Sequence, residues 1–239
     1  EMYNASIDDY DDESAAHDKT STALGILNTM ITILLYFENS TEIIGKLEVH
    51  YSKVIKLIFN DKIEDFYAEA GELIENTLFL TRSVSPIMWS LFGDFISCLM
   101  DDEDITLYLE DALPSLKNYL IYGGQIIKEN AEIQESFFKL IMCVFQMDFE
   151  ESDNFGTNDL IYVGDLSTNF VLALDFHTSA KYLPVLINYS LKFMCEVSER
   201  LKAKSKKYII QLLDVIVASL VVDPNTTSVS YTHLTLPTN

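Results

Sequence analysis

The feature that most constrains the fold is a unit that restarts along nearly the whole chain: an amphipathic helix, a short polar turn and a second such helix. Within residues 63–80 the apolar side chains recur at i, i+3, i+4 and i+7, which is the period of one helix face. The opposite face carries Asp65, Glu69, Glu72 and Asn76. The same kind of spacing predicts helices over residues 20–37, 43–59, 63–80, 86–100, 105–122, 130–146, 159–176, 180–201 and 205–222.

Taken two at a time, these helices form pairs that begin near residues 43, 86, 130 and 180. The period of roughly 40–50 residues is typical of HEAT and armadillo helix pairs. Because such a pair cannot bury both of its faces alone, it must stack on its neighbours. The sequence therefore predicts an all-α fold, an α-solenoid of about four HEAT-type antiparallel pairs plus a leading helix. Solenoids present long surfaces to partners, so we expect protein binding rather than catalysis.

The two ends of the chain differ from this pattern. Residues 1–19 are rich in Asp and Glu, and we expect them to form a disordered acidic loop. Residues 226–239 contain no acid and no helical period, and the string VSYTHLTLPT resembles a translated sequencing adapter. We therefore expect the solenoid to span residues 20–225. Because the chain starts on Glu1 and has two atypical ends, we expect it to be a fragment of a longer protein.

The charge balance is strongly acidic, with a formal net charge of −21. Such a surface repels nucleic acid and anionic lipid and attracts basic partners, so we expect neither direct nucleic-acid binding nor membrane binding. The alternative explanation of each acidic cluster is a solvated surface that only confers solubility.

Sequence motifs for catalysis or cofactor binding are missing. The chain contains no G-x-x-x-x-G-K-[S/T], no G-x-G-x-x-G and no H-E-x-x-H, and its four histidines are scattered. The acidic runs at 101–104 and 148–153 lack the spacing of an EF-hand. We therefore expect no enzyme activity, no cofactor and no metal site.

Several helix boundaries carry specific signals. Ser85 followed by Pro86 predicts an N-cap and the first helical residue. Gly123 and Gly124 predict the end of a helix. We expect Pro114 and Pro184 either to kink their helices or to mark where they begin.

Four stretches, residues 23–34, 54–73, 83–95 and 105–120, resemble the importin-β, or karyopherin-β, family of nuclear transport receptors. Residues 182–201 and 209–225 resemble it more weakly. The similarity is greatest to the importin-seven and importin-eight branch. The most specific part is a Ser-Pro-x-x-Trp segment ending at Trp89, followed by Tyr-Leu-Glu-x-x-Leu-Pro ending at Pro114. The resemblance covers about residues 20–225 and places them in the C-terminal half of a superhelix of HEAT repeats.

The resemblance also implies roles for the helices. Residues 63–80, 105–122 and 205–222 correspond to B helices, which line the concave, cargo-holding side in this family. Residues 86–100 and 180–201 correspond to A helices of the convex side. Acidic residues on this segment would then face a basic cargo such as a ribosomal protein or a histone; the candidates are Asp65, Glu69, Glu72, Asp101, Asp102, Glu103 and Asp104.

The resemblance further implies shuttling between cytoplasm and nucleus, and binding of the Phe-Gly repeats of nuclear-pore proteins. The family binds the GTPase Ran through N-terminal repeats that have no counterpart here. An alternative function for a solenoid of this type is a HEAT scaffold that organises an enzyme complex, as a phosphatase regulatory subunit does.

Overall fold

The computed structural model describes residues 2–101, 105–146, 157–201, 210 and 213–214, and among these residues it contains helices and no strand. The all-α prediction is confirmed. The helices are α1 (Met2–Tyr36), α2 (Thr41–Asn60), the short 3-10 helix η1 (Glu64–Phe66), α3 (Tyr67–Thr81), α4 (Pro86–Asp101), α5 (Ile105–Tyr122), α6 (Gly124–Glu129), α7 (Ala131–Gln146), α8 (Thr157–Ala173) and α9 (Phe176–Leu201).

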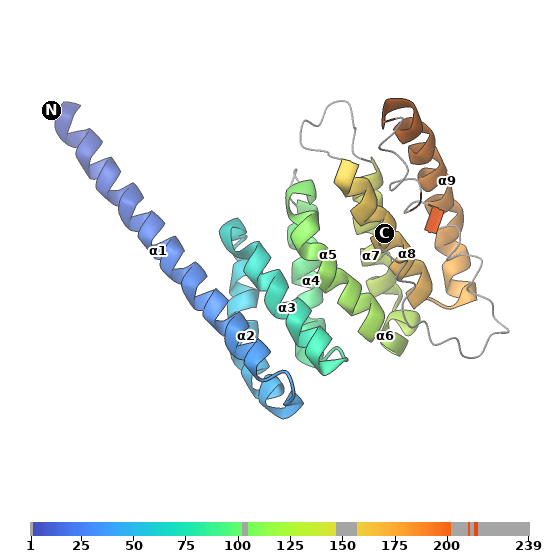
Figure 1. The fold of residues 1–239 in the computed structure, drawn as a ribbon, viewed down its shortest axis with the longest axis horizontal. Coiled ribbons are helices and arrows are strands. Elements are labelled where there is room, and N and C mark those ends of the chain that lie inside the picture. Colours follow the sequence, from blue (N-terminus) through green and yellow to red (C-terminus); the bar gives the residue numbers. More distant parts are fainter. Residues whose placement is uncertain (1, 102–104, 147–156, 202–209, 211–212, 215–239) are drawn as a thin grey trace, which may run out of the picture.

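The longer helices form two layers. In the first, named layer B, α3 packs between α1 and α5, and α5 packs in turn against α8. In the second, named layer A, α4 packs between α2 and α7. The α9 helix extends layer A, because its Tyr182 and Tyr189 rings lie 4.9 and 5.6 Å from Phe138 and Phe145 of α7. Figure 1 shows α3, α5 and α8 side by side and running in the same direction.

Successive long helices alternate between the layers, so each antiparallel pair contributes one helix to each layer. This arrangement confirms the predicted solenoid of helix pairs. It also places residues 63–80 and 105–122 in one layer and residues 86–100 and 180–201 in the other, as the family resemblance implies. Which layer lines a concave surface stays a prediction.

The first helix is longer than the sequence suggests. The α1 helix runs from Met2 to Tyr36 and so includes most of the acidic segment expected to form a loop. The end of α1 is anchored, because Leu27, Ile31 and Leu34 are buried in the core. Once a helix has such a nucleus, each added residue gains a backbone hydrogen bond without a new nucleation cost. This explains how a segment without an apolar face continues the helix.

A second difference follows α5. This helix ends at the predicted glycine pair, but the short helix α6 then precedes α7. Gly124 has a φ of +51°, which allows the chain to turn between the two helices. The buried Gln134 side chain donates hydrogen bonds of 2.7 and 3.0 Å to the carbonyl groups of Ile127 and Lys128 at the end of α6. A periodicity argument cannot detect such a short helix.

The two prolines expected to kink or to begin a helix both lie inside helices. Pro114 is within α5, and Pro184 is within α9, which begins at Phe176 rather than at Ala180. The Asp175 carboxylate explains this early start, since it accepts a 2.8 Å hydrogen bond from the Thr178 amide and caps the helix. This hydrogen bond lowers the pKa of Asp175. Most of the helix expected over residues 205–222 falls outside the described residues.

Aromatic side chains connect the repeats through the core. The Phe92 and Phe137 rings are 4.9 Å apart, the Phe137 and Phe170 rings 6.2 Å, and the Phe170 and Tyr182 rings 5.3 Å. This series passes from α4 through α7 and α8 to α9. The repeats therefore share one continuous apolar core.

The predicted N-cap of α4 also holds a buried carboxylate in place. The Ser85 hydroxyl accepts a 3.0 Å hydrogen bond from the Met88 amide and donates one to the Glu48 carboxylate of α2. Glu48 is only 5% exposed. Its burial raises its pKa, and the hydrogen bond from Ser85 offsets part of this increase.

Replacing Glu48 with glutamine is therefore expected to stabilise the protein at neutral pH, because the amide oxygen can still accept the Ser85 hydrogen bond without a buried charge. A pKa that is raised on folding means that the carboxylate destabilises the folded state once the pH exceeds its unfolded value, near 4.5. Urea unfolding should show that Glu48→Gln has a higher free energy of unfolding than the original chain at neutral pH. The difference should shrink well below pH 4.5. The exposed Glu42→Gln variant of the same helix is the control, and an equal gain at both pH values would contradict this account.

Gly123 lies where a larger residue does not fit. A Cβ atom at this position would contact the Tyr119 carbonyl oxygen and lie 2.5 Å from the Ile127 Cδ1 atom. We expect Gly123→Ala to lower the free energy of unfolding by about 1–3 kcal/mol through overpacking. Gly93 of α4 has open space around it, so the matched variant Gly93→Ala should raise the free energy of unfolding by up to about 1 kcal/mol. Urea unfolding of both variants checks this contrast, and similar stabilities would contradict it.

Candidate partner-binding face

Carboxylates gather on the side of α3 that does not pack against the core. The buried residues of α3 include Ala70, Leu73 and Ile74, and the side chains opposite them are exposed or half-buried. On the neighbouring helix α5, buried Leu109, Ala112 and Leu116 leave a corresponding side open. We name the carboxylates of this surface the layer B acidic face; they are Glu69, Glu72, Glu75, Glu110 and Asp111.

Hydrogen bonds between α3 and α5 fix the relative position of these carboxylates. The Ser115 hydroxyl donates a 2.6 Å bond to the Gly71 carbonyl, and the Asn118 side chain donates a 3.0 Å bond to the Glu75 carbonyl. A Cβ atom at Gly71 would lie 3.5 Å from the Asp111 carbonyl oxygen, which is an ordinary van der Waals contact, so the two helices pack closely at this point. Two helices held in this register present their acidic residues as one surface.

The carboxylates of this face have no salt-bridge partner among the described residues. The nearby Lys117, two turns after Glu110 on α5, pairs instead at 2.6 Å with Asp165 of α8. Burial, with a further contribution from the nearby Glu72 charge, raises the pKa of Glu75. The face therefore carries uncompensated negative charge that an external cation can neutralise.

The structure places only part of the predicted acidic set on this face. Glu69 and Glu72 belong to it, with Glu72 exposed and Glu69 half-buried, while Asp65 is an exposed residue of η1 just before α3. Asp101 ends α4, but its side chain and residues Asp102, Glu103 and Asp104 lie outside the described part. Their proposed role stays a prediction.

Sequence reasoning missed three members of the face. Glu75 lies one turn after Glu72, and Glu110 and Asp111 lie on the next B helix. The same periodicity analysis, extended to residues 105–122, would have found Glu110 opposite the apolar stripe. That Glu75 belongs to this face becomes clear only when α5 is placed beside α3.

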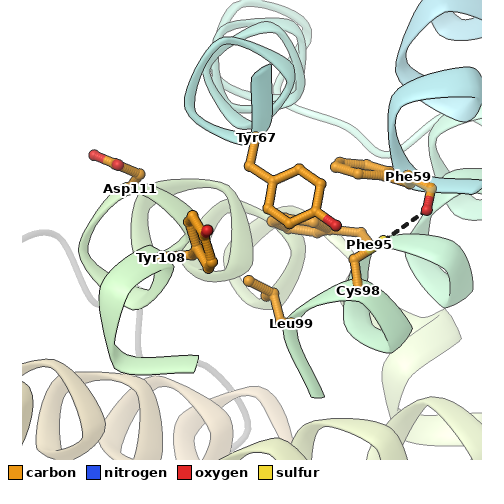
Figure 2. A pocket seen from close by; sticks show the side chains of 8 residues that line it. Phe59, Tyr67, Phe95, Cys98, Leu99, Tyr108 and Asp111 are labelled. Atoms are coloured by element: carbon orange, nitrogen blue, oxygen red, sulfur yellow. Dashed lines mark hydrogen bonds between the residues drawn. The ribbon is translucent and has the colours of Figure 1, made fainter. Parts of the chain in front are cut away.

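A small cavity lies beside this face, between α2, α3, α4 and α5 (Figure 2). Its volume is about 10 Å³, which is about the space for one water molecule. The Phe59 and Phe95 rings stack at 5.1 Å on one side, and the Cys98 thiol donates a 2.8 Å hydrogen bond to the Phe59 carbonyl oxygen. The cavity is too small for a substrate, and its apolar rings belong to the core.

In the described ranges no group of three or more His, Cys, Asp or Glu side chains could hold a metal ion. None of the described helices combines the length and the apolar character that crossing a membrane requires.

Comparison with known proteins identifies relatives of this two-layer array. The chain is 35% identical to the nonsense-mediated mRNA decay protein 5 of Saccharomyces cerevisiae over 219 residues, which is 91% of this chain and 20% of that protein. It is 31% identical to importin-8 of Homo sapiens and of Mus musculus over 136 residues, which is 56% of this chain and 13% of either relative. This segment belongs to the importin-β family.

A probable importin of Encephalitozoon cuniculi extends the set, at 22% identity over 135 residues. No family model matches the chain, and no solved structure matches it. The importin-like chain spans about a fifth or less of the length of these relatives. The similarity to the yeast protein and to importin-8 confirms the family resemblance for this segment.

Proposed function

We propose that this importin-family segment binds basic protein cargo, such as ribosomal proteins or histones, on the layer B acidic face. The observation that carries the proposal is the group of five carboxylates on α3 and α5 without a salt-bridge partner in the described structure. The net charge of −21 supports it, because a negative field speeds the encounter with a basic partner and disfavours acidic competitors.

The full-length receptor would carry such cargo between cytoplasm and nucleus. The names of the relatives include importins, and this supports a role in nuclear import. In this proposal the receptor contacts Ran through repeats outside this segment and passes the nuclear pore by binding Phe-Gly repeats. The segment itself contributes part of the surface for cargo.

The proposal predicts a steep dependence on salt. Raising the ionic strength from about 0.01 M to about 0.15 M shortens the Debye length from about 30 Å to about 8 Å, so the affinity for a lysine-rich peptide should fall sharply. Fluorescence anisotropy of the labelled peptide measures this, with a serine-rich peptide of equal length as the control. A dissociation constant that does not respond to salt would reject the electrostatic account.

A further inference from the structure

Large apolar side chains are exposed at the C-terminal ends of three neighbouring layer B helices. They are Phe79 of α3, Ile121 of α5 and Leu172 of α8, with exposed fractions of 46%, 54% and 38%. Single exposed apolar residues are common on protein surfaces. Here, however, one occurs at the same end of each of three adjacent parallel helices, as Figure 1 shows for the helices themselves. We name these three side chains the apolar row.

The apolar row lies on the same side of the helices as the acidic residues. Phe79 follows Glu72 by seven residues on α3, and Leu172 follows Asp165 by seven residues on α8, so each pair shares one helix face. Ile121 follows Glu110 by eleven residues, which is again about a whole number of turns. A rise of 1.5 Å per residue separates the apolar from the acidic side chains by roughly 10–16 Å. The face thus has an acidic part and an apolar edge.

The position of Phe79 in this row is fixed by its neighbours. The Arg82 guanidinium lies 4.0 Å from the centre of the Phe79 ring and donates a hydrogen bond to the Tyr122 hydroxyl of α5. Arg82 adopts a φ of +53°, so the backbone turns sharply where α3 ends. These contacts join the ends of α3 and α5 through Arg82. The exposed ring is therefore held in a defined place.

We infer that the partner segment is an amphipathic helix, with an apolar stripe on the apolar row and lysine or arginine side chains against the layer B acidic face. This inference rests on the proposed function and adds the shape and chemistry of the partner. The charge complementarity is the argument for a basic partner, and the exposed apolar side chains are the argument for an amphipathic one.

The dimensions of the face suit a helix. Packed helices lie about 8–10 Å apart, so a row across three of them is roughly 16–20 Å long. A partner helix covers this length in about eleven to thirteen residues, or three to four turns, with apolar residues at i, i+3, i+4 and i+7. Its diameter of about 10–12 Å reaches from the apolar row to the nearer carboxylates.

The test compares two synthetic peptides with the same lysine positions and the same length. In one peptide leucines form a stripe at helical spacing, and in the other glutamines replace these leucines. We expect the full 239-residue chain to bind the leucine peptide about tenfold or more tightly than the glutamine peptide in fluorescence anisotropy at constant salt. Equal affinities would overturn the inference.

Variants of the chain then locate the contact. The triple variant Phe79→Ser, Ile121→Ser, Leu172→Ser should lose the preference for the leucine peptide and keep its affinity for the glutamine peptide. The control variant removes exposed apolar side chains of layer A through Val49→Ser, Leu57→Ser and Leu191→Ser and should keep the preference. A preference that survives the triple variant would overturn the inference. Circular dichroism checks folding, and the single variant Ile121→Ser replaces the triple variant if the latter unfolds.

Three further outcomes separate this inference from the proposed function and from self-association. If both peptides bind equally but in a salt-dependent manner, the amphipathic partner is rejected and the proposed function stands. If neither peptide binds in a salt-dependent manner, the proposed function fails, and the inference fails with it. If sedimentation shows a dimer that the triple variant abolishes, a second copy of the chain covers the row and the inference is overturned.

Discussion

Replacing Phe137 with alanine is expected to lower the free energy of unfolding by about 3–5 kcal/mol. The Phe137 ring of α7 is fully buried and lies between Phe92 of α4 and Phe170 of α8. Its removal leaves a cavity where three helices meet, and the surrounding backbone can fill that cavity only in part. Urea denaturation followed by circular dichroism measures the loss.

The neighbouring residue provides the control for this variant. Phe138 is half-buried and contacts Tyr182 of α9 at 4.9 Å, so Phe138→Ala should cost clearly less than Phe137→Ala. The comparison separates a core shared by three helices from a contact within layer A. If the two variants were equally stable, Phe137 would not connect the repeats as described.

The second large effect concerns binding. The triple variant Glu69→Gln, Glu72→Gln, Glu110→Gln should weaken binding of a lysine-rich peptide and reduce its dependence on salt. Exposed ion pairs contribute about 0.2–1 kcal/mol each, so three of them together contribute about 0.6–3 kcal/mol. This corresponds to a loss of affinity of roughly threefold to 140-fold. Fluorescence anisotropy at several salt concentrations measures both quantities.

A variant of layer A removes the same amount of charge elsewhere. Glu42→Gln, Asp94→Asn and Glu132→Gln lie on α2, α4 and α7. This control lowers the net negative charge equally, so it should reduce long-range attraction slightly and leave the bound state almost unchanged. If both variants lost the same affinity, binding would depend on net charge alone and not on the layer B acidic face.

Much of this fold follows from the sequence. The apolar periodicity of residues 43–59 and 105–122 predicts α2 and α5 almost to the residue, because both helices bury a wide stripe. Ser85 before Pro86 predicts the start of α4, because the local capping chemistry is sufficient there. The segment ending at Trp89 supports the family resemblance, which the similarity to importin-8 then confirms.

The remaining features depend on contacts between distant residues. The α6 helix is held by a hydrogen bond from Gln134 of α7, and local helix propensity does not take account of such a contact. The continuation of α1 through residues 2–19 depends on the buried anchor at its far end. The layer B acidic face includes Glu110 and Asp111 because Ser115 and Asn118 align α5 with α3. A single sequence gives the helices but not the register between them.

The most direct test of the proposed cargo surface is to map where a basic peptide binds. A lysine-rich peptide that carries a photo-reactive group is cross-linked to the full chain, and the modified residues are identified by mass spectrometry. The account predicts cross-links on α3 and α5, lost at high salt and in the Glu69→Gln, Glu72→Gln, Glu110→Gln variant. Cross-links confined to α2, α4 or α7, or none at saturating peptide, would contradict it.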